Sequence, residues 1–186
     1  MPSPLHARRS TPVRQLGEPG PDPQQLQAML QAAVRVPDHG KLTPWRFVLI
    51  RGAARQALGQ RLALRRRQRD PDAGETELEK DRNRFCHAPL VVAVVSRIAP
   101  GHRIPEQEQL LSGGCVCFSL LLAAQELGFG AQWLTGWPAY DAQVAGWLGL
   151  EEHERVLGFV HVGTAKMQMP ERERPDARSR VTEWTR

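Results

Sequence analysis

The residues that could bind or transform a ligand lie in four separate segments rather than in one motif. They are Arg8-Arg9-Ser10, Arg35-x-Pro-x-His39, Gly128-Phe-Gly-Ala-Gln-Trp-Leu-Thr-Gly136 and Arg172-Glu-Arg174-Pro175. Each segment also has a simpler interpretation: Arg8 and Arg9 as surface charge, His39 as a loop capping residue, and the glycines as a helix stop followed by a turn. No single segment specifies a reaction or a ligand, so the four segments are considered together, in their order along the chain.

The sequence lacks the local patterns of several common catalytic and cofactor sites. There is no Gly-x-Gly-x-x-Gly after a strand, no Walker loop, no Gly-x-Ser-x-Gly elbow and no histidine pair at zinc-binding spacing. Cys115 and Cys117 are two positions apart on an expected helix, where their side chains point away from each other, so we expect core cysteines. The sequence therefore predicts no metal site, no catalytic triad and no carboxylate pair.

The elements that must position the four segments alternate between helix and short strand. Pro23 follows the capping residue Asp22 and begins a helix that is expected to run to about residue 36. Further helices are expected over residues 53–69, 75–85, 103–127 and 140–148, and strands over residues 45–50, 89–96, 131–134 and 155–162. The strand 89–96 is apolar on both faces, which indicates the centre of a sheet covered by helices on both sides. The pattern predicts a layered α+β or α/β fold.

Length and composition favour one domain over residues 1–186. The chain has 186 residues, of which 41% are hydrophobic and 24% charged, and its net charge is +5. The densest basic run, residues 61–69, has no interleaved aromatic residues, so it is interpreted as a solvated helix face rather than a nucleic-acid site.

The cysteines and apolar segments indicate where the protein is found. Three cysteines are too few for a disulfide framework, and the N-terminus has no apolar region typical of a signal peptide. The most apolar stretch, residues 110–124, is shorter than the roughly 20 residues of a membrane span and is expected to be a buried core helix. We expect a cytoplasmic protein without a membrane partner.

Two segments are expected to lie outside the main body. Residues 62–85 comprise the end of the helix 53–69, a stretch of loop composition over residues 70–74 and the polar helix 75–85, and are expected to form an exposed excursion that acts as a lid. Residues 165–186 are charged and contain two prolines, so they form a C-terminal arm that either dangles or wraps a partner subunit.

Taken together, these features resemble the nitroreductase family of FMN-dependent NAD(P)H oxidoreductases, and its YdjA-like branch in particular. The resemblance spans nearly the whole chain. It is carried by Arg8-Arg9-Ser10, the Pro-Asp-His to Pro-Trp-Arg-Phe run of residues 37–47, Ala88-Pro-Leu-Val-Val, Gly113-Gly-Cys-Val-Cys, Leu127-Gly-Phe-Gly-Ala-Gln-Trp and Val156-Leu-Gly-Phe-Val-His-Val-Gly-Thr164. It implies a nitroreductase-like α+β fold with a central, mostly antiparallel sheet in three α-β-α layers, and a homodimer with domain-swapped arms.

The resemblance also implies an FMN site at the subunit interface. Arg8 and Ser10 would hold the phosphate, Arg9 would contribute through its backbone or on the ribityl side, and Arg172 or Arg174 would complete the site. The flavin would be lined by Trp133, Leu134 and Thr135 of the same chain and approached by Arg35 and His39 of the partner chain. Leu134 replaces the polar residue that is usual after this tryptophan.

The implied activity is hydride transfer from NADH or NADPH through FMN to nitro-aromatic or quinone-like acceptors, by a ping-pong mechanism. The cofactor carries the hydride at N5, so no catalytic side chain is required. Arg35 would stabilise the reduced, anionic flavin or pair with a neighbouring carboxylate. An FMN carrier or regulatory flavoprotein without nitroreductase turnover is the alternative function.

Overall fold

An antiparallel sheet of five strands forms the centre of the protein in the computed structural model, which describes residues 3–185. The strands are β1 (Leu16–Gly17), β2 (Trp45–Arg51), β3 (Leu90–Arg97), β4 (Gly130–Leu134) and β5 (Glu154–Ala165). Their order is β1-β5-β3-β2, and β4 also pairs with β5. Every pairing is antiparallel, as expected. Four strands match the expected ones, whereas β1 has only two residues and was not expected.

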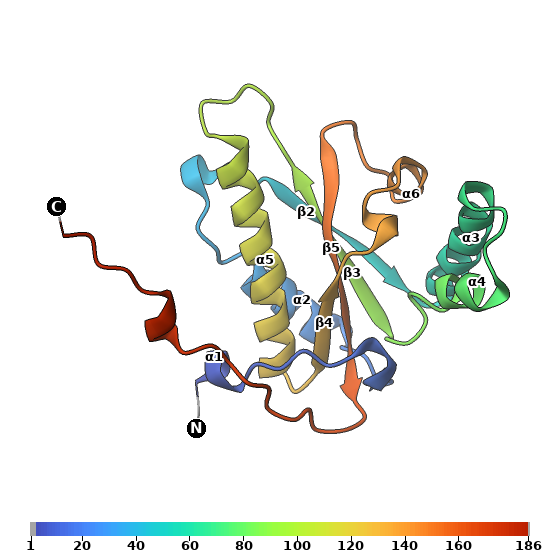
Figure 1. Ribbon diagram of the computed structural model, residues 1–186, viewed down its shortest axis with the longest axis horizontal. Helices are drawn as coiled ribbons and strands as arrows, with labels where there is room; N and C mark the ends of the chain where they lie inside the picture. The colour runs from blue at the N-terminus through green and yellow to red at the C-terminus, as the bar shows by residue number, and fades with distance from the viewer. Residues whose placement is uncertain (1–2, 186) are drawn as a thin grey trace.

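Helices cover both faces of the sheet (Figure 1). One face carries α2 (Pro23–Ala33) and α5 (Glu106–Glu126), and the other carries α3 (Ala53–Arg69), α4 (Glu75–Arg82) and α6 (Ala142–Trp147). Side chains alternate along β3, so Val92 and Val94 belong to the core under α2 and α5, while Val91 and Ala93 belong to the core under α3. The expected layers and the central, buried position of β3 are confirmed.

The first long helix, α2, begins where its capping residues require. Asp22 accepts a hydrogen bond from the Gln25 backbone N–H at 2.8 Å, and the Gln25 side chain accepts one from the Asp22 N–H at 3.0 Å. Pro23 occupies the first turn, where its missing N–H costs nothing.

The apolar helix α5 is a core helix, as expected. Within residues 3–185 it is the one helix with the length and composition of a membrane span, but half of that window is buried inside the fold. Val116, Cys117 and Leu120 face the core. Leu111 is 62% exposed and Cys115 is also exposed, so the expectation of two core cysteines is wrong for Cys115. The open face of α5 therefore carries apolar side chains that the rest of the chain does not cover.

The arginine run of α3 is not merely a solvated face. Arg65 pairs with Asp141 at 3.1 Å, and Arg66 pairs with the buried Asp81. The guanidinium groups of Arg66 and Arg69 lie 5.6 and 4.9 Å from the centroid of the Trp137 ring. The run attaches α3 to α4 and to the segment before α6, which sequence alone could not reveal because these partners lie 15 to 76 positions away.

Residues 62–85 are packed into the body more tightly than expected. Leu62, Leu78 and Phe85 are buried, and a Cβ placed at Gly59 would lie 2.0 Å from the Arg82 carbonyl oxygen, so α3 and α4 approach closely. Neither α3 nor α4 has enough apolar residues to show an amphipathic pattern in the sequence, but packed together the two helices bury a shared set of apolar side chains. The expectation of a uniformly exposed excursion is therefore corrected.

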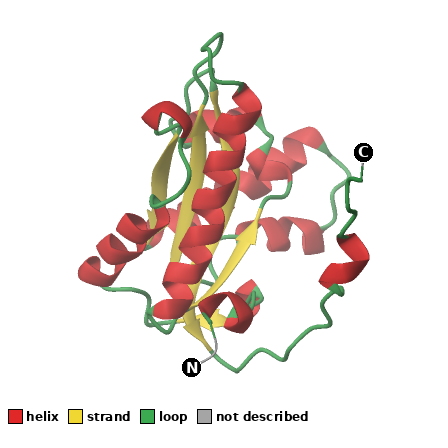
Figure 2. Cartoon of the chain, turned by 90° about the vertical axis from the view of Figure 1, so that its left-hand side faces the viewer, coloured by secondary structure: helices red, strands yellow, loops and turns green. Residues whose placement is uncertain are grey.

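The segment after β5 leaves the body of the molecule. β5 continues to Ala165, where Leu16 pairs with Ala165 and the Lys166 N–H donates to the Gln15 carbonyl at 2.9 Å. The remaining arm runs clear of the sheet and ends far from it (Figure 2). Trp184 is 80% exposed, so within one chain this tryptophan has almost no packing.

Candidate functional site

The N-terminal and C-terminal arginines come together beside the short helix α1 (Pro4–Ala7). The Arg8 side chain donates to the Ser10 hydroxyl at 3.2 Å, and Arg174 donates to the Arg8 carbonyl at 3.4 Å. Glu171 pairs with Arg9 and lies 3.5 Å from Arg174. Arg172 lines the same hollow as Arg8 and Arg174. Residues 166 positions apart thus form one arginine cluster, defined as Arg8, Arg9, Arg172 and Arg174.

The arginine cluster carries more positive charge than its own carboxylates neutralise. Burial lowers the pKa of Arg8, and repulsion from Arg174, Arg172 and Arg9 lowers that pKa further. Glu171 and Glu173 are the carboxylates in this hollow. Four guanidinium forks with a neighbouring hydroxyl form a donor set suited to a doubly charged phosphate, and a bound anion would relieve their mutual repulsion.

A strip of backbone leads from the arginine cluster along β4. The Thr11 N–H donates to the Ala131 carbonyl at 3.0 Å, and the Val13 N–H donates to the Gln132 side-chain oxygen at 2.9 Å. Residues 11–13 therefore lie against β4, and the chain then turns in the short 3-10 helix Val13–Gln15, which carries Arg14. The arginine cluster precedes this segment and Arg14 follows it.

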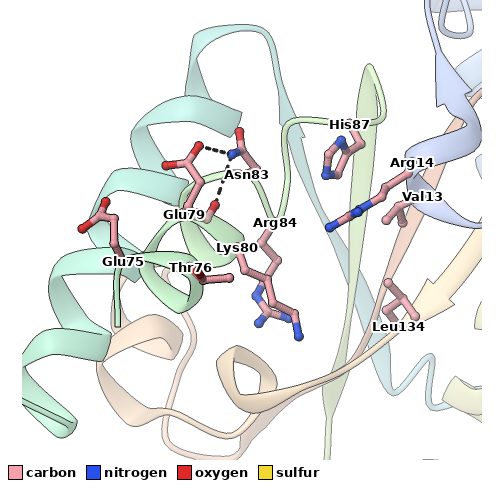
Figure 3. A pocket seen from close by; sticks show the side chains of 10 residues that line it. All are labelled: Val13, Arg14, Glu75, Thr76, Glu79, Lys80, Asn83, Arg84, His87 and Leu134. Carbon is pink, nitrogen blue, oxygen red and sulfur yellow. Dashed lines mark hydrogen bonds between the residues drawn. The ribbon is translucent and has the colours of Figure 1, made fainter. Parts of the chain in front are cut away.

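A pocket of about 620 Å³ opens where this strip ends. It is lined by Val13, Arg14, Glu75, Thr76, Glu79, Lys80, Asn83, Arg84, His87 and Leu134 (Figure 3). The apolar contribution comes from Val13 and Leu134, and the polar contribution is mainly basic. An apolar floor with basic rim groups fits a flat ring system with polar edges.

The carboxylates of this pocket are already engaged. Glu79 accepts from Arg82 at 2.7 Å and from Asn83 at 2.6 Å, and these bonds, Arg82 first, hold the pKa of Glu79 below its usual value. Glu75, the other carboxylate of the lining, accepts from Arg82 as well. Asp81 lies outside the lining but binds Arg84 of the pocket: burial would raise the pKa of Asp81, but hydrogen bonds from Arg66, Arg84 and Trp137 outweigh it and keep the pKa low. The pocket therefore stays basic.

Two histidines lie on this side of the sheet. Burial lowers the pKa of His87, on the pocket rim, and the charges of Arg14 and Lys166 lower it further. Burial also lowers the pKa of His161, to about 4, with smaller contributions from His87 and Arg84. Both side chains are therefore neutral near pH 7.

The three predicted flavin-lining residues of β4 and its end do not share one surface. Leu134 lines the pocket, whereas the Trp133 side chain points to the opposite face, as alternation along a strand requires. The Trp133 indole donates to the Leu157 carbonyl at 3.2 Å and lies over Gly158, where a Cβ would come within 1.8 Å of its nitrogen. Thr135 is partly buried directly after the strand.

Arg35 and His39 lie at the other end of α5. The His39 Nδ1 atom is 2.8 Å from Glu108, near the start of α5, whereas the Arg9 N–H donates to Gln125, near its end. Glu108 and Gln125 are 17 residues apart, about 25 Å along a helix. Within residues 3–185 no carboxylate lies within 4.0 Å of the Arg35 guanidinium. One chain therefore does not bring all the predicted site residues together.

Four basic pocket residues were not predicted from the sequence: Arg14, Lys80, Arg84 and His87. They come from three segments that only the fold brings together. The one available signal was the spacing of Lys80 and Arg84, four positions apart and thus on one side of a helical path. Among the described residues no cluster of three or more His, Cys, Asp or Glu could hold a metal ion.

Comparison with known proteins identifies the fold and its relatives. The model of the nitroreductase family matches residues 5–164. The chain is 36% identical over 170 residues to "Putative NAD(P)H nitroreductase" of Haemophilus influenzae, covering 91% of this chain and 90% of that protein. It is 32% identical over 161 residues to "Putative NAD(P)H nitroreductase YdjA" of Escherichia coli, covering 87% and 86%. The solved structure of a nitroreductase with bound FMN from Bacteroides fragilis shares the fold, with a TM-score of 0.72 and 22% identity over 98% of this chain and 97% of that one.

Proposed function

Because the chain belongs to the nitroreductase family, we propose that it is an FMN-dependent NAD(P)H oxidoreductase that reduces nitro-aromatic or quinone-like acceptors. The observation that carries this proposal is the pairing of Thr11 and Val13 with β4, because the arginine cluster lies before this segment and the pocket beside Leu134 lies after it. A molecule with a phosphate at one end and a flat ring at the other suits these two places. FMN has this shape, and the Bacteroides fragilis relative is described with FMN bound.

Arg8, Ser10 and a tail arginine would hold the FMN phosphate through charge-assisted hydrogen bonds. Glu171 lies between Arg9 and Arg174 and keeps the tail in place beside the N-terminal segment. The ring system would enter the pocket over Leu134, with the Arg14 guanidinium close to its polar edge.

When bound, FMN supplies the hydride-transfer chemistry, which the nicotinamide and the acceptor use in turn. The protein orients the ring, keeps the pocket basic and provides the apolar floor of Val13 and Leu134. We retain residues 62–85 as the cover of this pocket, in the form of a packed wall that includes α4.

Two copies of the chain would complete each site. Arg35 and His39, about 25 Å along α5 from the arginine cluster, would reach the flavin of the partner. The exposed apolar face of α5, with Leu111 and Phe118, provides a surface for the second copy. β2 pairs only with β3 among the described strands, so its open edge suits residues 181–184 of the partner's arm as an added strand.

The wider setting is part of the same proposal. Residues 1–186 form one domain that works as a homodimer in the reducing cytoplasm, where its three free cysteines remain unpaired. No membrane partner is required, because α5 belongs to the core.

The decisive experiment is the spectrum of the purified protein. We expect a yellow protein with stoichiometric FMN, and bleaching of the flavin band when NADH or NADPH is added without air. Colourless protein that does not take up added FMN would contradict the proposal. A flavin band that neither nicotinamide bleaches would favour the carrier function instead.

A further inference from the structure

The pocket beside Leu134 presents cationic side chains from two segments and a neutral histidine from a third. Arg14 belongs to the 3-10 helix Val13–Gln15, Lys80 and Arg84 belong to α4 and the turn after it, and His87 precedes β3. In Figure 3 the Arg14 guanidinium points across the pocket toward α4, and the nitrogen ends of Lys80 and Arg84 lie together on the α4 side. The basic groups thus surround one space.

The two carboxylates of the same pocket are turned to other partners. Glu79 is bound by Arg82 and Asn83, and Glu75 is 2.5 Å from Arg82 and 3.9 Å from Arg67. Within residues 3–185, neither Arg14 nor Lys80 has a carboxylate within 4.0 Å. Their charges are therefore available to a ligand.

Arg84 is held in a fixed orientation. Its Nε and Nη2 atoms donate to Asp81 at 3.0 and 2.7 Å, and Asp81 is fully buried. The remaining Nη1 atom would lie 3.0 Å from a Cβ at Gly136, in the turn that follows β4. One edge of the guanidinium thus faces Asp81, and the other remains at the pocket wall. Because Asp81 is shared with Arg66, the group of three keeps a net positive charge.

We infer that the pocket selects acceptors that carry a carboxylate or similar anion on an aromatic ring, with Lys80 and Arg84 as specificity-determining residues. This inference rests on the proposed function and names its substrate class. A single cation beside the ring, such as Arg14, is enough to balance the one negative charge of a reduced flavin. Lys80 and Arg84 are then in excess of what the cofactor requires, and an anionic substrate accounts for them.

The test uses two acceptors that differ in charge, para-nitrobenzoate and para-nitrobenzamide, with the flavin-loaded wild type and the variants Lys80→Gln and Arg84→Gln. We expect each variant to raise the KM for para-nitrobenzoate about tenfold, the usual cost of losing a charged hydrogen bond, and to leave the KM for para-nitrobenzamide within about twofold. If Arg84→Gln fails to fold, Lys80→Gln still tests the inference, because Lys80 has no ion pair within residues 3–185 whose loss would destabilise the fold.

The matched control is Arg103→Gln, which removes one exposed positive charge from the loop before α5, outside the lining of the pocket. It should leave both KM values unchanged, which separates the pocket's own charges from the net charge of the protein. A readout independent of turnover is the Kd of the flavin-loaded protein for benzoate and for benzamide, measured by calorimetry. We expect benzoate to bind more tightly in the wild type, and this preference to be lost in the two pocket variants.

Equal effects of Lys80→Gln and Arg84→Gln on both acceptors, or an unchanged benzoate Kd, would overturn the inference. A raised KM for NADH with unchanged acceptor values would assign these cations to the reductant and overturn it as well. Failure of the proposed function is recognised separately, because the protein would then lack a flavin band that NADH or NADPH bleaches. Benzoate calorimetry on that protein would still decide whether Lys80 and Arg84 bind an aromatic anion.

Discussion

His161 is a buried residue whose nitrogen lacks the hydrogen bond that buried polar groups normally make. Its Nδ1 atom has no partner within the described chain, and its ring stacks on Phe85 with the centroids 5.9 Å apart. Burial, followed by the charges of His87 and Arg84, lowers its pKa from 6.5 to about 4. The folded state therefore binds fewer protons than the unfolded state between these two values.

This difference makes His161 a source of acid sensitivity. As the pH falls from about 6.5 to about 4, His161 is protonated in the unfolded chain but stays neutral in the folded chain. The free energy of unfolding therefore decreases by about 3 kcal/mol in total. We expect His161→Phe, which keeps a ring beside Phe85, to remove about 2 kcal/mol of the loss between pH 7 and pH 5. Urea unfolding at the two pH values measures it.

The control for this prediction is His153→Gln, at an exposed position on the loop before β5. This variant should show the same difference in the free energy of unfolding between pH 7 and pH 5 as the wild type. If His161→Phe loses as much stability as the wild type between pH 7 and pH 5, other groups, such as His87, cause the acid sensitivity.

Arg35 is predicted to act on the flavin of the other chain. Its side chain is exposed, and it has no carboxylate partner among residues 3–185 that would neutralise it. If it lies near the reduced, anionic flavin, Arg35→Ala should lower the FMN midpoint potential by about 20–50 mV, equivalent to about 1–2 kcal/mol for two electrons. Arg103→Ala, another exposed arginine, is the control. An unchanged potential in Arg35→Ala would rule out this role.

Asp81 joins three elements through one carboxylate. It accepts hydrogen bonds from Arg66 of α3, from Arg84 after α4 and from the Trp137 indole at 3.1 Å, and its side chain is fully buried. Asp81→Ala would leave two guanidinium groups close together without their shared anion. We expect a loss of about 3–5 kcal/mol in the free energy of unfolding, measured with urea.

A second carboxylate of α4 supplies the comparison. Glu79 is exposed and pairs with Arg82 and Asn83 at the surface, so Glu79→Ala should cost far less stability than Asp81→Ala. Hydrogen exchange should also show faster exchange of the α4 amides in Asp81→Ala. Similar losses for the two variants would mean that Asp81 does not hold α3, α4 and Trp137 together.

The elements that sequence could predict are those whose signals are local. Asp22 with Pro23 gives the start of α2, and the unbroken apolar run gives β3, because each is decided by neighbouring residues. The packing of α4 was not predictable, since Leu78 and Phe85 are buried only through contacts between distant elements: Phe85 shares a core cluster with Leu62 and the sheet, and α3 approaches α4 closely at Gly59. The same reason explains the site: Arg8 and Ser10 belong to a local motif, whereas Arg14, Lys80 and His87 meet only after folding.

At the scale of the whole molecule, one chain holds two halves of the predicted site at opposite ends of α5. Arg9 contacts the end of this helix and His39 its beginning, so neither half can close on the other. The arm beyond Lys166 and the open face of α5 are likewise exposed in one chain. A second copy related by a two-fold axis would place the Arg35 and His39 end of one chain beside the arginine cluster of the other chain, and the reverse.

Two truncations of the arm separate its two expected roles. The chain must be cut after Met167 rather than earlier, because Thr164 and Ala165 pair with β1 and Lys166 bonds to Gln15. A protein ending at Met167 loses Arg172 and Arg174, and we expect weaker FMN binding, by about tenfold or more, together with a weaker dimer. A protein ending at Asp176 keeps both arginines but loses residues 181–184 and Trp184, so it should bind FMN nearly normally while dissociating into monomers at higher concentration. FMN titration and analytical ultracentrifugation distinguish the two. If the chain ending at Asp176 dimerises as tightly as the full chain, Trp184 has no place on the partner, and the arm serves the phosphate site alone.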